Sequence, residues 1–593
     1  MKKINILSIF IALLMLSSCY DLRFGDAGLS EPPETSGATL DTLFNSKANA
    51  DKVLVTAYSY LSIGLPTTSD NKMGGNNIES ITDLQHSSRN NINDGPRNLY
   101  YNASLNANTV TGAGNENYRF GSESEYYAIR YAAIFIENAN RITDATQNEK
   151  NSMIAEAKVC MAIAYYNLLR YCGGVPILEH SVDVNDKMFF PRNTFAETVD
   201  FIVGLCDEAA GYLPWVNTPV RDGRMTKAAA MALKLRVLCF AASDTFNSDQ
   251  LFHPAANKYH CYTNYDKNRW KRAKDAADDF MRELKRSGFY KLVQPTDDTP
   301  MARRLAYRAG YFTRGTSESI ISLRKGFSYN EVYGYYSDGV NSSGPTLNWA
   351  NMFEWADGTE FPEDFNWESP DKQPFFTPDG TGKAPGIPTR DPRLYENIAV
   401  PGDIWWNGTV APLHTNSPNY RPSGSGFNPM KFLLQDYKDR NAPVHWPYLR
   451  FAEVLLNAAE AYNEYDGGPS PKAYEYVNDV RARVGLPGLP EGMDKLTFRK
   501  ALIKERACEF GYEEVRWFDM IRWGLKEDFQ KKLYGLSSKG NDQNAPTEFT
   551  FKVYELPDRA WVRSFDTKWY LAPIPQTEID KNYGMTQNPG WQY

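Results

Sequence analysis

Aromatic side chains beside small polar residues are the groups in this chain best suited to chemistry. Tyrosine, tryptophan and phenylalanine make up 14% of the 593 residues, and many lie in stretches rich in glycine, proline and asparagine. A flat ring next to an amide or carboxylate suits a ligand with an apolar face and many hydroxyl groups, such as a sugar. The candidate ligand-binding residues are Tyr100, Tyr101, Tyr335, Tyr336, Trp349, Trp355, Trp405, Trp406 and Asn407.

Each of these rings has a second interpretation, in which it packs a loop against the protein body. For any single ring we favour packing. For the group as a whole we favour a ligand surface, because the rings concentrate in non-helical segments. The polar residues that would complete this surface are Asn102, Asp338, Asn341, Asn348, Asn351 and Asp357.

Two sets of carboxylates could support hydrolysis, and we interpret both as structural. The first set lies in the loop 355–365 and comprises Asp357, Glu360, Glu363 and Asp364. A glycoside hydrolase would need two such groups roughly 5–10 Å apart, but acidic loops are usually just solvated. The second set, Glu505 and Glu509, should form an ion-pair network, because every acid in that region has a base at helical spacing.

The sequence lacks the motifs that would indicate several other classes of protein. It contains no HExxH, GxSxG or GxxxxGK[ST] motif, so metalloprotease, hydrolase-triad and P-loop functions have no support. The net charge of −7 argues against a nucleic-acid partner. We therefore predict that the chain is not an enzyme and holds no cofactor or metal, although a structural calcium ion remains open.

Cys19 is placed to carry lipid. Lys2 and Lys3 give a basic start, residues 4–16 are largely apolar, and Leu16-Ser17-Ser18 precedes the cysteine. An apolar run of roughly 13 residues is shorter than the ~20 that cross a bilayer, and is typical of a signal core. The pattern resembles the bacterial lipobox. It predicts a signal peptide at 1–18, acylation of Cys19 and a flexible tether at 19–46, the alternative being an ordinary secretory signal with an incidental cysteine.

The remaining cysteines do not indicate a disulfide framework. Six of the seven are left once Cys19 carries lipid. Their spacing is irregular and includes no CxxC pair. We expect buried free thiols rather than disulfides or a zinc site.

Paired helices must position these residues. Apolar residues recur at helical spacing, and the expected helices are 48–61, 126–142, 151–171, 194–212, 224–242, 269–286, 448–465, 471–484, 498–510 and 515–523. Helical pairs with small residues at packing positions indicate TPR-like stacking, although the TPR consensus itself is absent. The segment 228–235 is apolar on most sides and should lie between two other layers.

One of these helices, 448–465, has two distinct sides. Its inward residues should be Leu449, Ala452, Leu455, Leu456, Ala459 and Tyr462. The opposite side carries Glu453, Asn457, Glu460 and Glu464.

Two long segments, 66–125 and 295–445, interrupt the helical pattern. Loop regions this long inside a helical protein are usually functional or disordered, and their aromatic content argues against disorder. We therefore predict a mainly α fold in a single body, 47–593. TPR-like helical hairpins would form a scaffold at 47–62, 126–290 and 446–525, and the loop-rich irregular half would carry the ligand surface.

Several sequence blocks, in order, together resemble the SusD/RagB family of outer-membrane nutrient-binding lipoproteins of Bacteroidetes. Besides Leu16 to Cys19, the blocks are Glu156-Ala157-Lys158 through Gly174-Val175-Pro176, Arg224 to Ala229, Leu449 to Leu456 with Ala459-Glu460-Ala461, Val480 to Pro487, Glu505-Arg506 through Arg522-Trp523-Gly524, Pro573 to Ile579, and Gln587 to Gly590. They span nearly the whole chain after Cys19.

The resemblance implies a SusD-like fold of TPR-like pairs supporting a loop-rich half. It also implies a SusC-like TonB-dependent transporter as partner, a glycan ligand and a surface-exposed, lipid-anchored place on the outer membrane. A RagB-type peptide ligand is the alternative. The shared blocks are scaffold, so the resemblance assigns no ligand residue.

Overall fold

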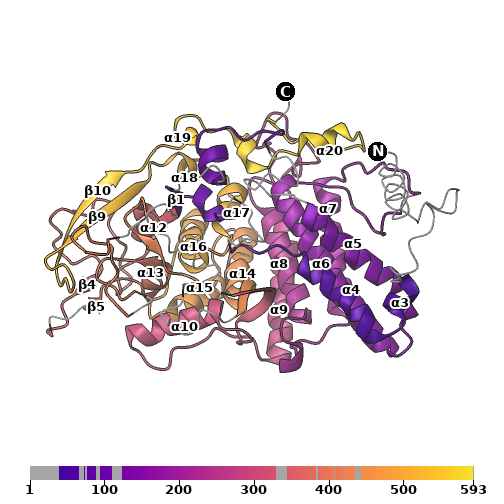
Figure 1. The fold of residues 1–593 in the computed structure, drawn as a ribbon, viewed down its shortest axis with the longest axis horizontal. Coiled ribbons are helices and arrows are strands. Elements are labelled where there is room, and N and C mark those ends of the chain that lie inside the picture. The colour runs from indigo at the N-terminus through magenta and orange to yellow at the C-terminus, as the bar shows by residue number, and fades with distance from the viewer. Residues whose placement is uncertain are drawn as a thin grey trace, which may run out of the picture.

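The computed structural model describes residues 39–65, 73, 76–88, 94–109, 123–183, 185–328, 343–381, 385–405, 408–420, 423–433 and 443–591. Within them the chain forms a helical half and a loop-rich half that lie next to each other (Figure 1). The predicted signal peptide and Cys19 fall outside these residues. No helix of the described part is long and apolar enough to cross a membrane.

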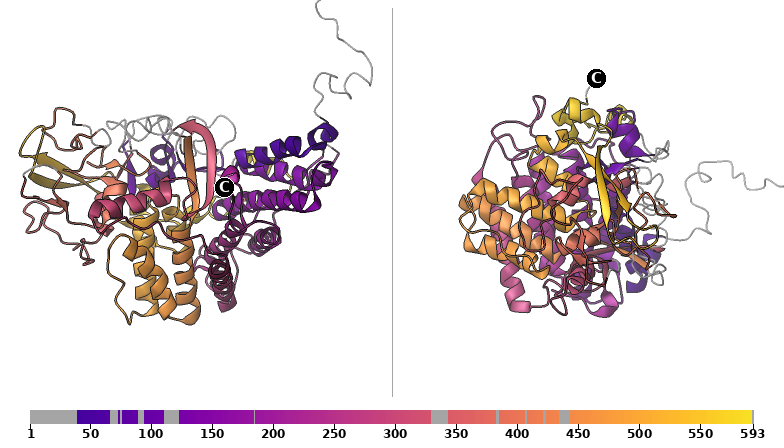
Figure 2. Two further views of the ribbon diagram at one scale, coloured as in Figure 1. Left: turned by 90° about the horizontal axis from the view of Figure 1, so that it is seen from below. Right: turned by 90° about the vertical axis from the view of Figure 1, so that its left-hand side faces the viewer.

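The helical half is a stack of successive helices. They are α4 (Lys47–Ser59), α5 (Glu123–Asn138), α6 (Gln147–Cys172), α7 (Phe195–Ala210), α8 (Lys227–Ala242), α9 (Lys267–Ser287), α14 (Phe451–Asp466) and α15 (Pro471–Arg483). Each packs against the next in this order, from α4 through α9 to α14 and α15. In Figure 2, left, the orange helices, which include α14 and α15, stand beside the purple helices of the earlier part of the stack. The stacking of neighbours confirms the predicted TPR-like scaffold.

Local sequence explains where these helices begin and end. Thr146 and Thr194 open α6 and α7 with capping boxes, in which Glu149 and Glu197 accept from the threonine backbone N–H. At the other end of α6, Gly173 has a φ of +79°, a backbone conformation that favours glycine. The helix boundaries are thus fixed by residues visible in the sequence.

The interior of the helical half is both apolar and ionic. α8 contacts α6, α7, α9 and α14, and its alanine-rich sequence is buried on most sides, as predicted. The polar side of α14 is buried as well. There Glu453 pairs with Arg236 of α8, and Glu460 pairs with Arg522. Carboxylates on a helix face can therefore mark a buried ionic contact as well as a solvated face.

One short helix corrects the extent of the predicted tether. α3 (Leu40–Phe44) lies inside the segment 19–46 and is capped by Thr39. Phe44 is fully buried, with its ring 5.9 Å from that of Phe135. Residues 39–46 therefore belong to the folded body, because burying Phe44 holds them against α5.

Outside this stack, the described chain combines further helices with two-stranded antiparallel sheets. The helices are α10 (Pro300–Phe312), α12 (Leu347–Met352), α13 (Pro392–Asn397), α16 (Lys495–Phe510), α17 (Arg516–Arg522), α18 (Lys526–Gln530), α19 (Ala560–Arg563) and α20 (Gln576–Asp580). The strand pairs are β1 (Gln85–Ser87) with β3 (Ser343–Pro345), β2 (Ser319–Ser328) with β8 (Pro443–Arg450), β4 (Phe376–Thr377) with β5 (Ile387–Pro388), β6 (Ile398–Ala399) with β7 (Asn428–Pro429), and β9 (Tyr534–Gly540) with β10 (Phe549–Glu555).

Two elements here differ from the sequence-based expectation. α10 is a full helix within a segment predicted to be irregular. Residues Tyr448 to Arg450, expected to begin a helix, instead complete β8, where Leu449 and Arg450 pair with Ile321 and Ser319. Pairing with β2 overrides their helical pattern, and α14 starts only at Phe451.

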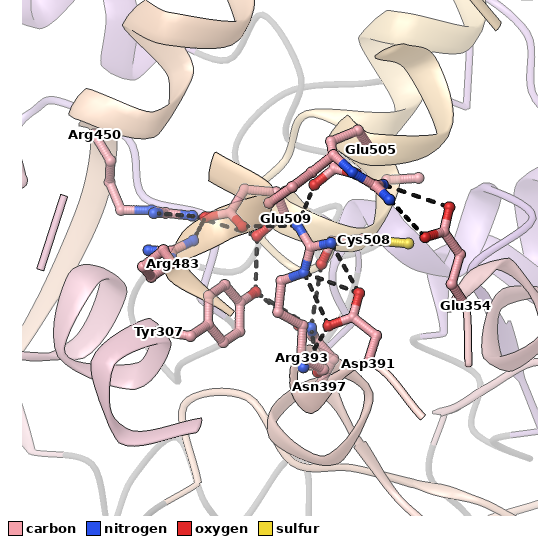
Figure 3. Close-up of polar contacts among 12 residues, drawn as sticks. Tyr307, Glu354, Asp391, Arg393, Asn397, Arg450, Arg483, Glu505, Cys508 and Glu509 are labelled. Atoms are coloured by element: carbon pink, nitrogen blue, oxygen red, sulfur yellow. Dashed lines mark hydrogen bonds and ion pairs between the residues drawn. The ribbon is translucent and has the colours of Figure 1, made fainter. Parts of the chain in front are cut away.

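A buried ion-pair network joins the elements around α16 (Figure 3). Glu509 contacts Arg393 and Arg450 at 3.2 Å each, and Arg483 at 2.6 Å. Glu505 contacts Arg393 at 2.5 Å and Arg481 at 3.0 Å. The prediction that these glutamates form ion pairs is confirmed. Their partners come from α13, β8 and α15, however, and not from helical spacing.

Burial and charge act against each other at Glu509. Burial alone would raise the pKa of its carboxyl, but the guanidinium groups of Arg483, Arg450 and Arg393 lower that pKa well below its usual range. Glu509 is fully buried and ionised. It acts as a structural anion between distant parts of the chain.

Candidate functional site

The ladder between β1 and β3 brings together the two loop-rich segments predicted to bind ligand. Ser87 of β1 pairs with Ser343 of β3, and Gln85 pairs with Pro345. β1 belongs to the segment 66–125, and β3 directly follows residues 329–342, which contain Tyr335 and Tyr336. Parts of both segments therefore lie side by side.

A buried polar network fixes this ladder. Asn76 donates through Nδ2 to Asp94 Oδ1 at 2.7 Å and to Ser343 Oγ at 2.6 Å. Ser87 Oγ donates to Asp94 Oδ2 at 2.7 Å, and Ser80 Oγ donates to Asn76 Oδ1 at 2.5 Å. All these side chains are buried. Because an unmade buried hydrogen bond is costly, the network specifies one arrangement of the ladder.

Two glycines let a third segment pack directly on the ladder. A Cβ on Gly344 would lie 1.6 Å from Ser423 Oγ, and one on Gly424 would lie 1.7 Å from Ser88 Oγ. The hydroxyl of Tyr554, on β10, donates to the Gly424 carbonyl oxygen at 2.8 Å. Only glycine allows this approach, which holds residues 423–425 and the β9–β10 hairpin against the ladder.

Tyr101 contacts the ladder through its hydroxyl group. Its hydroxyl donates to the Ser80 carbonyl oxygen and accepts from the Ser87 N–H at 2.9 Å. The guanidinium of Arg559 lies 4.7 Å from its ring centre. Burial, together with Arg559, lowers the pKa of the neighbouring His86 to about 3, so this histidine is neutral. The half-buried Tyr101 therefore has a structural role, because its hydroxyl is already hydrogen-bonded to the backbone of Ser80 and Ser87.

Two of the predicted ligand residues are interior side chains, which corrects the expectation that they form an exposed platform. Trp349 is fully buried, and its Nε1 donates to the Ala507 carbonyl oxygen at 3.2 Å. Tyr100 is 3% exposed and packs edge-on against Trp517 and Trp561. Their rings already have protein partners, so we leave both residues out of the ligand surface.

Trp355 and Trp405 are also buried, at 6% exposure each, so the expectation that they form an exposed platform is corrected as well: both rings shape loops. The Trp355 ring lies 5.0 Å from that of Phe361, with Lys372 Nζ 4.0 Å from its centre. The backbone of Trp405 closes a tight turn, in which its N–H donates to the Thr409 carbonyl oxygen at 2.7 Å. Trp406 and Asn407, in the same turn sequence, lie outside the described residues, as do Tyr335 and Tyr336.

The acidic loop 355–365 has structural contacts. Asp357 Oδ1 accepts from the Thr359 N–H at 3.0 Å, and hydrogen bonds from Thr359 lower the pKa of this carboxyl. Glu360 pairs with Lys504 at 3.0 Å, while Glu363 and Asp364 are exposed to solvent. A carboxyl held ionised in a turn is a poor general acid, which fits a structural loop.

Tyr420 and Tyr554 are two aromatic residues at the ladder that the sequence analysis missed. Tyr420 is 38% exposed and comes shortly before the packed segment 423–425. Tyr554 is half-buried, and burial, with a smaller contribution from Tyr420, raises the pKa of its hydroxyl. The composition of 416–426, rich in asparagine, proline, serine and glycine, was the signal that could have identified Tyr420.

Neither metal nor thiol chemistry is indicated in the part of the chain that the structure describes. No group of three or more histidine, cysteine, aspartate or glutamate side chains there is arranged to hold a metal ion. The six cysteines from Cys160 to Cys508 are free and buried, as predicted. Burial raises the pKa of Cys508, so its thiol is not activated.

Comparisons with known proteins agree with this architecture. Residues 307–591 match the model of the SusD family, and residues 33–238 match a SusD-like family described as starch-binding and associating with the outer membrane. SusD-like protein P2 of Formosa agariphila is 23% identical over 493 residues, which cover 79% of this chain and 81% of that protein.

Solved structures of SusD-like proteins share the fold. One from Bacteroides fragilis is 25% identical, covers 94% of this chain and 100% of its own, and superposes with a TM-score of 0.70. Surface glycan-binding protein A from Bacteroides fluxus is 18% identical, covers 92% and 99%, and has a TM-score of 0.58. The helical scaffold, the loop-rich half and the family matches lead to one conclusion: the chain belongs to the SusD/RagB family.

Proposed function

We propose that this protein is a cell-surface lipoprotein of the outer membrane that binds oligosaccharides and passes them to a SusC-like TonB-dependent transporter. The observation that carries the proposal is the β1–β3 ladder, where the two aromatic-rich segments pair with each other. The description of one matching family as starch-binding supports a glycan ligand. The name of the Bacteroides fluxus neighbour, a surface glycan-binding protein, points the same way.

The ligand surface of this proposal surrounds the ladder. Tyr420 and Tyr554 supply ring surface beside the packed segment 423–425. Tyr335 and Tyr336 lie in the stretch of sequence that directly precedes β3. Apolar ring faces next to serine and asparagine groups suit the C–H faces and hydroxyls of a sugar. Trp406 and Asn407, which follow Trp405 in the sequence, are further proposed contacts.

Lipid on Cys19 would keep the protein beside its transporter. The described residues start at Thr39, so 20 residues, 19–38, separate them from the proposed anchor. A segment of this length spans at most roughly 70 Å when fully extended. A tether of this length gives the body a high effective concentration at a membrane partner and still allows it to move.

Calorimetry with a panel of neutral oligosaccharides tests the proposal. Purified wild-type protein should bind at least one glycan, and a variant with both Tyr335→Ala and Tyr336→Ala should bind it more weakly. Trp406→Ala with Asn407→Ala forms a second pair. Unchanged affinity in both double variants, with unchanged helical circular dichroism, would remove these residues from the ligand surface.

Two further measurements separate glycan binding from its alternatives, which are peptide binding and glycan hydrolysis. Binding of peptides in place of every glycan would favour a RagB-type peptide ligand. The appearance of new reducing ends during incubation with the best glycan would show hydrolysis, and substitution of Glu363 and Asp364 by glutamine and asparagine would then test the acidic loop as its source.

A further inference from the structure

A hollow lies at the end of the loop-rich half that is distant from the helical half, and the described residues that line it carry no charge. It is bordered by β4, β5 and the β9–β10 hairpin (Figure 1). Its volume is about 470 Å³, including the space open to solvent. Phenylalanine, proline, glycine, threonine and a single glutamine line it. An uncharged lining favours a neutral occupant, because a charged one would lose its hydration without gaining a partner.

Phenylalanine rings form the floor and one wall of this hollow. Phe375 and Phe551 are buried, whereas Phe376 and Phe549 are half-buried. Phe549 and Phe551 are two residues apart on β10 and so project to the same side. Their ring centres lie 6.3 Å apart with an interplanar angle of 22°. Together they present a nearly continuous apolar surface.

Gly402 keeps this aromatic surface open. Its φ is +91°, and an added Cβ would lie 3.1 Å from Phe549 Cε2 and 3.4 Å from Phe376 Cδ2. Any other residue here would place a side chain against the two rings. The backbone passes close to both phenylalanines and leaves their neighbouring space unfilled.

Polar groups stand at the rim of the hollow. Gln373 and Thr547 are exposed, and Thr377 is half-buried. Amide and hydroxyl groups above an apolar floor match a ring that has C–H groups on one face and hydroxyls at its edge. The geometry points to a subsite for one neutral pyranose ring of a glycan, separate from the β1–β3 ladder.

This subsite rests on the proposed function and adds a second contact for long glycans. Phe549 and Tyr554 lie five residues apart along β10, which corresponds to roughly 17 Å. An oligosaccharide shorter than this distance, held at the ladder, does not extend to the hollow. A polysaccharide with many repeats can occupy both places, and the second contact then strengthens binding through effective concentration.

Affinity electrophoresis in gels that contain a bound neutral polysaccharide tests the subsite, with calorimetry on a short oligosaccharide of the same sugar. The variants are Phe549→Ala, which removes a wall of the hollow, and Gln373→Ala, which changes only an exposed rim residue. Ile387→Ala is the matched control, because Ile387 is 54% exposed on the adjacent β5 but does not line the hollow.

We expect Phe549→Ala to weaken retention by the polysaccharide about tenfold, as for the loss of a stacking contact worth about 1.4 kcal/mol. Gln373→Ala should weaken it in the same direction, while the affinity for the short oligosaccharide and the behaviour of Ile387→Ala should match wild type. Wild-type retention in both hollow variants would overturn the subsite and leave the proposed function standing. Failure of the wild-type protein to bind any glycan, or binding of peptides alone, would overturn both.

Discussion

The substitution Gly344→Ala should lower glycan affinity while the helical half still folds. The new Cβ would lie 1.6 Å from Ser423 Oγ and 2.5 Å from Ser425 Oγ, far inside van der Waals contact. Residues 423–425 must therefore move by more than 1 Å from the β1–β3 ladder, and overpacking of this kind costs about 1–3 kcal/mol. Gly344 lies in β3, which packs mainly against β1 and β7, so folding of the helical half should be unaffected. We expect glycan affinity to fall while helical circular dichroism stays at the wild-type level.

The matched control is Gly468→Ala, because no atom lies within 4 Å of a Cβ placed there. It should bind glycan as wild type does and lose no stability. Adding Ser423→Gly to Gly344→Ala removes the nearest clash, although Ser425 Oγ remains close, and should restore part of the affinity. Calorimetry and thermal unfolding of the four proteins would check this. Full glycan affinity in Gly344→Ala alone would refute the claim that the ladder positions the ligand surface.

Three other perturbations test other parts of the account. Glu509→Gln removes the shared partner of three buried arginines and should destabilise the protein by about 3 kcal/mol in urea unfolding. The loss is limited because Glu318 still pairs with Arg450 and Glu505 still pairs with Arg393. The control Glu363→Gln, at an exposed position, should change stability by less than about 0.5 kcal/mol. Because arginines lower the pKa of Glu509, its contribution is present above about pH 4.5 and is lost as the pH falls further; equal acid sensitivity of wild type and Glu509→Gln would contradict this. Burial and neighbouring Glu514 raise the pKa of Glu79 to about 8, so wild type should lose stability from about pH 5 to 8, and Glu79→Gln should flatten that decline; identical pH profiles would show that Glu79 is not its source. Shortening residues 20–38 should reduce glycan uptake by cells more than glycan binding by soluble protein, and equal losses in both would count against the tether.

The periodic parts of the sequence predicted the scaffold well. α6 and α7 have capping boxes and regular apolar stripes, so their positions follow from local sequence. α10 was not predicted because it lies in a segment dominated by loop-forming residues. β8 was mistaken at Tyr448 to Arg450 because its partner, β2, lies more than a hundred residues away in the chain. Local patterns do not report pairing over such distances.

The direction in which an aromatic ring points was the harder prediction. Trp349 and Trp355 lie in polar, glycine-containing surroundings, yet both rings are buried against other parts of the loop-rich half. Composition indicates that a segment needs aromatic residues, but it does not distinguish a ring that packs the loop from one that faces a ligand. The same limit applies to Glu505 and Glu509, whose arginine partners are assembled only by the fold.

A crystal structure of the protein with an oligosaccharide identified from the panel would test the central claim most directly. The account predicts that sugar rings lie at the β1–β3 ladder, in contact with Tyr420 or Tyr554 and with the segment that contains Tyr335 and Tyr336. A ligand held on the helices α4 to α9, with the ladder free of sugar, would contradict it.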